Sequence, residues 1–391
     1  MFKTMTRFLC ALLSCLLLSG AALAEESVFT RKMVERSLYQ VGNTQRIHKA
    51  IEKARRGETV SLVYLGGSIT EGSNAVPKKT NCYAARSAQL FAEKFMPDAS
   101  RLEYHNAGIS GTPSLLGITR CAQDVLAYAP DIVFLEFAVN DSTDDQSRMA
   151  YESLVRKLLQ SETQPAVVLV LTLTDSGYSA HVHMKQIAKH YNLGVVSVYD
   201  AIWPELFTKN MQWSSYSADF AHPTTEGHAF VAELIGYYFD QAAATEADEY
   251  VMPQEARYGK ALEKLRNIRR GDSAIVSVGS FPEDVTVSYS YLLGWKHGIA
   301  CGMKPMVLEV TGSYMTFVFK QENNKSCGTA EVWVDGQKKA TLSGYAADAW
   351  GQPVTQLIPL GENTTHTVEL RMAEGNATKL FSLLDIAVAA E

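Results

Sequence analysis

The sequence contains a serine, a histidine and an aspartate whose surroundings suit nucleophilic catalysis. Ser68 follows two glycines and the apolar run Val60–Leu65, so it lies at a sharp turn after a predicted strand. Asp219 and His222 come later in an Asp-x-x-His pattern. A serine becomes a nucleophile when a histidine accepts its proton and a carboxylate orients that histidine. The sequence therefore predicts a catalytic triad of Ser68, His222 and Asp219.

Three hydrogen-bond donors are predicted to form an oxyanion hole beside the serine. They are the backbone N–H groups of Ser68 and Gly108 and the side-chain amide of Asn140. Gly108 and Asn140 each follow a run of strand length, so we expect both at one edge of a sheet. Donors fixed around the developing negative charge accelerate acyl transfer. Glu136 shares a strand face with Asn140 and is predicted to hold it in place; a capping or surface glutamate is the alternative.

Alternating strands and helices must position these residues. Strand patterns and helix patterns alternate five times: Val60–Leu65 and Tyr83–Phe95, Leu102–His105 and Leu115–Tyr128, Ile132–Phe137 and Gln146–Gln160, Val167–Leu173 and His181–Tyr191, Val195–Tyr199 and Thr225–Phe239. Near-continuous apolar strands suit a parallel sheet covered on both faces. The pattern predicts an α/β fold over residues 25–250, a three-layer doubly wound (flavodoxin-like) five-stranded parallel sheet.

The chain changes character after this region. A polar, acidic stretch leads to a charged amphipathic pattern, which predicts a linker helix within residues 251–274, from Pro253 to about Arg269. Strand-like alternation then replaces helical periodicity, beginning with Val285–Tyr289, and Asp335-Gly336 is a strong hairpin signal. Residues 275–391 are therefore predicted to form a small antiparallel β-sandwich domain.

The N-terminus has the features of an export signal. Lys3 and Arg7 accompany the apolar run Phe8–Leu18, and Ala22–Ala24 has the small residues of a cleavage site. We expect residues 1–24 to be removed and the mature protein to be secreted or periplasmic, with no stable membrane insertion afterwards.

Four cysteines remain after the predicted cleavage. An even number in an exported protein favours disulfides. The sequence predicts one bridge per domain, Cys82–Cys121 and Cys301–Cys327. Buried free thiols are the alternative.

Charge and motif content exclude several classes of partner. The formal net charge is -6 and no basic run occurs, which argues against nucleic acid as a partner. No set of His, Asp and Cys has metal-ligand spacing, and no glycine-rich phosphate loop occurs. We therefore expect no metal and no other cofactor; the oligomeric state stays open.

The four sequence blocks around the predicted site resemble, in the same order, those of the SGNH (or GDSL) hydrolase superfamily of serine esterases. One departure is Gly67, where many members carry Asp before the serine. The appended β-domain is similar to that of bacterial carbohydrate-esterase members. The resemblance implies hydrolysis of carboxylic esters through a covalent acyl-enzyme.

The substrate expected from the sequence is a short acyl ester, O-acetyl above all, on a carbohydrate or polysaccharide. Export places such polymers within reach, and no long apolar lid surrounds the predicted site. Trp295, Trp333 and Trp350 of the β-domain could stack on sugar rings; the alternative is that this domain only buttresses the hydrolase domain through the Pro253–Arg269 helix. A polysaccharide O-acetyltransferase, a lipase or thioesterase of the same fold, and a non-catalytic carbohydrate-binding protein are the alternatives.

Overall fold

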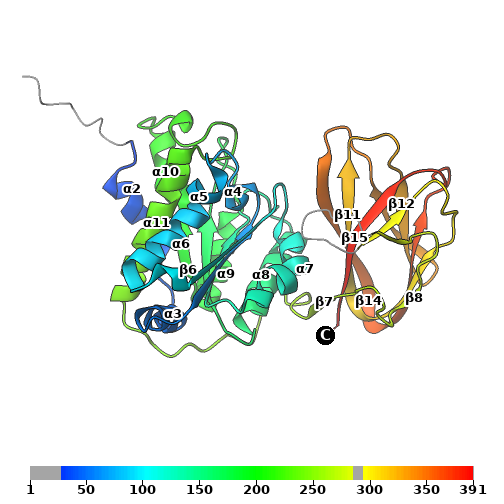
Figure 1. Ribbon diagram of the computed structural model, residues 1–391, viewed down its shortest axis with the longest axis horizontal. Coiled ribbons are helices and arrows are strands. Elements are labelled where there is room, and N and C mark those ends of the chain that lie inside the picture. Colours follow the sequence, from blue (N-terminus) through cyan, green and yellow to red (C-terminus); the bar gives the residue numbers. More distant parts are fainter. Residues whose placement is uncertain (1–27, 285–293, 391) are drawn as a thin grey trace, which may run out of the picture.

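The computed structural model describes residues 28–284 and 294–390, which form an α/β domain followed by a β-domain (Figure 1). The predicted signal peptide, residues 1–24, and the predicted strand Val285–Tyr289 lie outside the described residues. Among the described residues, no helix has both the length and the apolar character needed to cross a bilayer.

The α/β domain is built on a six-stranded sheet with the order β1-β6-β5-β4-β2-β3. Its strands are β1 (Leu38–Gln40), β2 (Val60–Gly66), β3 (Leu102–Gly108), β4 (Ile132–Glu136), β5 (Ala166–Leu171) and β6 (Gly194–Ser197). The strands β2 to β6 are parallel, which confirms the predicted class. The sequence did not predict β1, which adds an antiparallel edge next to β6.

The strand order places the carboxyl end of β2 at the topological switch point of the sheet. The chain moves from β2 to β3 on one side and then crosses to β4 on the other side. In open α/β sheets, ligands bind outside the carboxyl ends of the strands at such a switch point. Ser68, which comes two residues after β2, therefore lies where this architecture favours a site.

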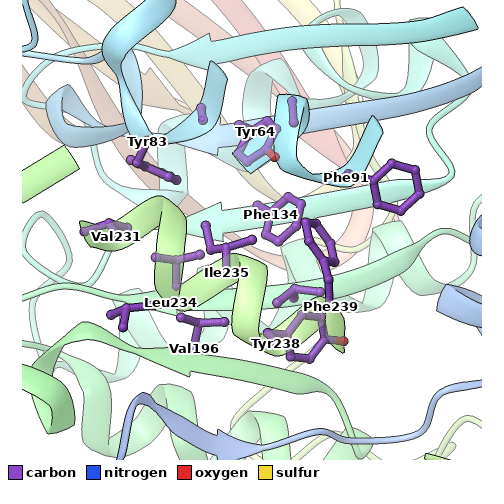
Figure 2. Close-up of a cluster of buried hydrophobic side chains, with 14 of the residues drawn as sticks. Tyr64, Tyr83, Phe91, Phe134, Val196, Val231, Leu234, Ile235, Tyr238 and Phe239 are labelled. Carbon is purple, nitrogen blue, oxygen red and sulfur yellow. The ribbon is translucent and has the colours of Figure 1, made fainter. Parts of the chain in front are cut away.

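Helices cover both faces of this sheet. They are α2 (Arg31–Ser37), α3 (Gln45–Arg55), α4 (Ser68–Glu71), α5 (Lys78–Asn81), α6 (Tyr83–Phe95), η1 (Ala99–Arg101), α7 (Ser114–Asp124), η2 (Leu126–Tyr128), α8 (Asp145–Leu159), α9 (His181–Tyr191), α10 (Val198–Phe207), η3 (Trp213–Ser215) and α11 (Thr225–Ala244). Tyr64 of β2 faces α3, α6 and α11, while its neighbour Leu65 faces α7 and α8. Figure 2 shows Leu234 and Ile235 of α11 in the first of these layers. The alternation of strand side chains between two apolar layers holds the sheet rigid beneath the site.

The β-domain is a nine-stranded antiparallel sheet that folds around one main core. Its strands are β7 (Leu265–Asn267), β8 (Ile275–Ser277), β9 (Glu283–Asp284), β10 (Gly294–His297), β11 (Met306–Glu322), β12 (Thr329–Val334), β13 (Gln337–Ser343), β14 (Trp350–Met372) and β15 (Phe381–Ala389). A bulge in β11 changes its parity, so Leu308 before the bulge and Phe317 after it face the same core. Asp335 and Gly336 both have positive φ in the turn between β12 and β13, which confirms the predicted hairpin.

The predicted helix from Pro253 to about Arg269 is wrong. The segment consists of turns and β7, and a buried carboxylate explains the difference. Glu152 of α8 accepts hydrogen bonds from the backbone N–H groups of residues 257, 258 and 259, at 2.6, 2.5 and 3.0 Å. These N–H groups form a nest around an acidic side chain from a distant helix, and this tertiary contact overrides the local helical pattern.

The two domains pack through α7. Leu116 of α7 contacts Val318 of β11 and Leu384 of β15 in a buried apolar cluster. The side-chain amide of Asn267 donates to the carbonyl oxygen of Thr119 on α7 at 2.9 Å. The β-domain therefore holds the helix that follows the β3 loop, next to the predicted site.

The predicted disulfides are absent, and all four cysteines are free. Cys82 lies in the apolar layer on one face of the parallel sheet, and Cys121 lies in the layer on the other face. The sheet between them prevents a bridge. In the β-domain, Cys327 is buried with its Sγ 3.6 Å from Glu322, while Cys301 is partly exposed.

Candidate active site

Ser68, His222 and Asp219 form a continuous hydrogen-bonded chain. Ser68 Oγ lies 2.8 Å from His222 Nε2, and His222 Nδ1 lies 2.8 Å from Asp219 Oδ2. The serine begins α4, which one glycine separates from β2, whereas the histidine and aspartate come from the loop before α11. Segments 154 residues apart thus place a nucleophile, a base and an orienting carboxylate within hydrogen-bond reach.

Asp219 is held in its ionised form. Burial alone would raise its pKa, but hydrogen bonds from the backbone N–H groups of His222 and Ala221, from the His222 ring and from Asn74 outweigh burial and lower the pKa to about 2. An ionised carboxylate accepts the Nδ1–H of His222, so Nε2 is left to accept the serine proton.

Further side chains fix the loop that carries this pair, and the sequence did not reveal them. Asn74 Nδ2 donates to Asp219 Oδ2 at 3.1 Å and to the carbonyl oxygen of His222 at 3.3 Å. Ser217 Oγ donates to the same carbonyl oxygen at 2.6 Å, and Trp213 Nε1 donates to the Asp219 carbonyl oxygen at 2.5 Å. Asn74 adopts φ 68°, which asparagine tolerates better than most residues. Asn74 lies 145 residues before Asp219 in the chain, and local patterns carry no signal for such a contact.

Asn140 lies against the backbone of the turn that carries the nucleophile. A Cβ on Gly67 would lie 2.2 Å from Asn140 Oδ1 and 3.5 Å from Asn140 Nδ2. The Oδ1 side of the amide therefore faces Gly67, and Nδ2 points away from it. Gly67 leaves the space that the amide occupies, which gives a physical reason for glycine at the position before Ser68.

Gly108 does not present a free N–H group, which corrects the prediction for this residue. Its N–H donates to Asn106 Oδ1 at 2.9 Å. A Cβ on Gly108 would lie 2.1 Å from the backbone nitrogen of Glu71, so this glycine permits close packing of β3 on α4. Gly111, three residues later, has φ 70°, and its N–H makes no hydrogen bond within the described part of the chain. Gly111, to which the sequence analysis assigned no role, has the available donor.

Glu71 joins α4 to the loop that carries Gly111. Its Oε2 accepts hydrogen bonds from the backbone N–H of Ser110, at 2.9 Å, and from the Ser110 hydroxyl, and its Oε1 pairs with Lys78. Burial alone would raise the pKa of Glu71, but the hydrogen bonds from Lys78 and Ser110 outweigh it and lower the pKa. This carboxylate therefore fixes the β3 loop relative to the nucleophile.

Glu136 is fully buried beneath the site, but its carboxylate contacts other residues than predicted. It accepts hydrogen bonds from Thr70 Oγ1 at 3.0 Å and from Thr172 Oγ1 at 2.8 Å. Its carbonyl oxygen accepts from the Gly67 N–H at 3.2 Å. Burial raises the pKa of this carboxyl group. Glu136 therefore joins the ends of β2, β4 and β5 and supports the nucleophile turn, which corrects the expected contact with Asn140.

The three tryptophans of the β-domain have different surroundings. Trp295 is buried, and Trp333 lies under the guanidinium of Arg371. Trp350 is 57% exposed, and its ring lies 3.4 Å from the position of a Cβ on Gly111. One exposed indole of the β-domain therefore reaches the loop beside the nucleophile. The described residues contain no group of three His, Cys, Asp or Glu side chains arranged to bind a metal ion.

Comparisons with known proteins give a matching family model and two similar solved structures. A model of the GDSL-like Lipase/Acylhydrolase family matches residues 64–230. A two-domain esterase (CEX) active on acetylated mannans, co-crystallized with mannopentaose, has 30% sequence identity and a TM-score of 0.81, covering 92% of this chain and 98% of its own. A second crystal structure of a two-domain esterase (CEX) active on acetylated mannans has a TM-score of 0.80 with the same identity and coverage. No curated protein matches the sequence.

Proposed function

The chain belongs to the GDSL-like lipase/acylhydrolase family and is a carboxylic ester hydrolase, and we propose that it removes acetyl groups from a carbohydrate through serine catalysis. The observation that carries this proposal is the 2.8 Å contact between Ser68 Oγ and His222 Nε2. The likeness to an esterase active on acetylated mannans, over 92% of the chain, supports the choice of substrate class.

In the first half of the reaction, Ser68 becomes acylated. Ser68 Oγ attacks the acyl carbon while its proton passes to His222 Nε2, and Asp219 stabilises the imidazolium that forms. When the tetrahedral intermediate collapses, His222 Nε2–H donates this proton to the sugar oxygen, which leaves as an alcohol. The acetyl group stays on Ser68 as an ester.

The second half returns the enzyme to its starting state. A water molecule gives a proton to His222 Nε2 and attacks the acyl carbon of the ester on Ser68. Collapse of the second tetrahedral intermediate returns the proton to Ser68 Oγ and releases acetic acid.

The oxyanion in both halves is stabilised by Ser68 N–H, Asn140 Nδ2 and Gly111 N–H, with Gly111 in the role first predicted for Gly108. The support for Gly111 is its N–H group, which has no hydrogen-bond partner among the described residues, on a loop that Glu71 fixes to α4. Each such donor contributes because it meets charge that develops only in the transition state.

The sugar is proposed to rest on Trp350. An indole that is 57% exposed beside Gly111 offers a flat apolar face to the C–H surface of a sugar ring. The β-domain then has two roles, because it also packs against α7. We further propose that residues 1–24 direct export, which would bring the enzyme to polysaccharides outside the cytoplasm.

Acetate release from acetylated polysaccharides tests this function. The purified enzyme is expected to release acetate from at least one of acetylated mannan, xylan or peptidoglycan and to prefer acetyl over octanoyl chromogenic esters. Ser68→Ala is expected to lower both activities by about 10⁴-fold. An enzyme that prefers octanoyl esters and releases no acetate from any polymer would be a lipase, and the proposal would fail.

A further inference from the structure

Loops that follow two different strands flank the nucleophile on opposite sides. The order β3-β2-β4-β5 puts the loop after β3, which contains Gly111 and lies next to Trp350 of β14, on one side of Ser68. The loop after β5, which contains Tyr178, lies on the other side, beyond the end of β4. Neighbouring strands lie about 4.8 Å apart, so three spacings place these loops on the order of 14 Å from one another.

Tyr178 is exposed but fixed. Its side chain is partly open to solvent, with 41% exposure for the residue, and its hydroxyl donates to the carbonyl oxygen of Asp141 at 2.5 Å. Its backbone N–H donates to Thr174 Oγ1 at 3.1 Å, and its carbonyl oxygen accepts from the Thr174 N–H at 3.0 Å. The ring is therefore held beside the strand end that carries Asn140 and loses little conformational freedom when a ligand covers it.

Phe220 belongs to the same side of the site. It lies between Asp219 and His222 in the sequence and is 61% exposed, although it is a large apolar residue. Its ring centroid lies 5.8 Å from that of His222, with the two planes at 73°. Its carbonyl oxygen accepts from the Asp175 N–H at 2.8 Å, which ties this loop to the one that carries Tyr178.

We propose that Phe220 and Tyr178 form a second sugar-binding subsite on the α/β domain, across Ser68 from Trp350. This inference rests on the proposed function and sharpens its substrate class. Two aromatic positions on opposite sides of the nucleophile fit a chain of several sugar units that passes over the site. The enzyme therefore acts on acetyl groups of internal units in an oligosaccharide or polysaccharide, in preference to single sugars. Rings that are already fixed bind the apolar face of a sugar with a small entropic cost.

The test compares substrates of different length. kcat and KM are measured for a small chromogenic acetate and for acetylated oligosaccharides of increasing length. For the unmodified enzyme, kcat/KM is expected to rise with length. Phe220→Ala and Tyr178→Ala are each expected to reduce the ratio of kcat/KM for the longer saccharide to kcat/KM for the chromogenic ester by about tenfold, mainly through KM.

Matched variants separate ring contact from damage to the fold. Phe220→Tyr keeps an aromatic ring and is expected to keep the ratio. Tyr178→Phe keeps the ring but loses the hydroxyl contact that fixes it, so it is expected to lower the ratio less than Tyr178→Ala does. Tyr39→Ala removes a tyrosine of similar exposure, 43%, from β1, the edge strand beyond β6, and is expected to leave the ratio unchanged.

The inference is overturned if kcat/KM does not rise with saccharide length, or if both alanine variants keep the ratio of the unmodified enzyme. An enzyme that shows length dependence but keeps its ratio in both variants would retain the proposed function and lose only this subsite. If no acetylated saccharide is a substrate while the chromogenic ester is hydrolysed, the proposed substrate class and the subsite both fail.

Discussion

Two histidine–aspartate pairs in this molecule have nearly the same geometry but lie in different domains. In the α/β domain, His222 Nδ1 lies 2.8 Å from Asp219 Oδ2. In the β-domain, His366 Nδ1 lies 2.7 Å from Asp335 Oδ2. The pairs differ at the other ring nitrogen, because His222 Nε2 meets the hydroxyl of Ser68, whereas His366 Nε2 meets the carbonyl oxygen of Glu362 at 2.9 Å.

The comparison indicates that the group facing Nε2 of the histidine decides what the histidine can do. Asp335 also accepts a hydrogen bond from the Thr367 N–H at 2.9 Å, and it lies in the turn between β12 and β13. The hydrogen bond from His366 to Asp335 thus ties this hairpin to β14 and raises the pKa of His366. A histidine whose nitrogens both meet backbone or carboxylate oxygens stabilises a fold; one that faces a serine hydroxyl can serve as a base.

The largest difference between the two pairs is expected when the aspartate of each is changed. Asp219→Asn is expected to lower kcat for acetyl esters by about 10⁴-fold, because an amide favours the wrong tautomer of His222. Asp335→Asn is the matched control, and kcat should stay within about twofold, as for other changes remote from the site. Similar losses in both variants, measured at equal folded fractions, would show that the two pairs cannot be separated in this way.

The next largest effect is expected at Asn140. This residue lies against Gly67, which precedes the nucleophile of the α/β domain. Asn140→Ala should lower kcat by about 10²–10³-fold with little change in KM, because one donor to the oxyanion is lost. Steady-state kinetics with a chromogenic acetate measure both constants. An increase in KM at constant kcat would assign Asn140 to ground-state binding of the substrate.

Gly67→Ala tests the same amide from the backbone side. The new Cβ would lie 2.2 Å from Asn140 Oδ1, so the amide must move. A displacement of about 1 Å can cost about 10²-fold in kcat. In the Asn140→Ala background, the same change should cost much less, because the two residues act through one contact. Fully additive losses in the double variant would contradict this coupling.

The smallest effect is expected in the β-domain and concerns stability. The raised pKa of His366 means that its pair stabilises the fold below the unfolded pKa of about 6.5, and that this contribution disappears as pH rises through the folded pKa. Asp335 is about half exposed, so Asp335→Asn should cost only about 0.2–1 kcal/mol. Thermal unfolding of the unmodified protein and of Asp335→Asn, at about pH 5.5 and about pH 9, measures this loss of stability, which is expected to be larger at the lower pH. A larger loss of stability at the higher pH would contradict the raised pKa of His366 in the folded protein.

Much of the fold and of the site could be predicted because the signals are local. Apolar runs of strand length and amphipathic helices define the parallel sheet, and the approach of Ser68 and His222 follows from motifs at two sheet positions. The chain departs from its local pattern where a distant side chain intervenes. Glu152 binds three N–H groups of the segment that was predicted to be a helix, and no pattern in that segment announces this partner.

Other predictions were wrong because spacing along the chain does not show which way a backbone or side-chain group faces in the folded protein. Gly108 ends β3 and Gly111 lies in the loop after it, and only three-dimensional structure shows that the N–H of Gly108 is bound to Asn106. Likewise, Cys82 and Cys121 are both near helix starts or ends along the chain, yet opposite faces of the sheet separate them. The position of Trp350 beside Gly111 depends on domain packing, which composition cannot supply.

Covalent labelling tests the central claim, that Ser68 is the nucleophile activated by His222. The enzyme is treated with a serine-reactive phosphonate, and the modified peptide is identified by mass spectrometry, with Ser68→Ala and Asp335→Asn as controls. We expect one adduct on Ser68, protection by an acetylated oligosaccharide, no adduct in Ser68→Ala and normal labelling in Asp335→Asn. An adduct on another residue that abolishes activity, or full activity in Ser68→Ala, would contradict the account.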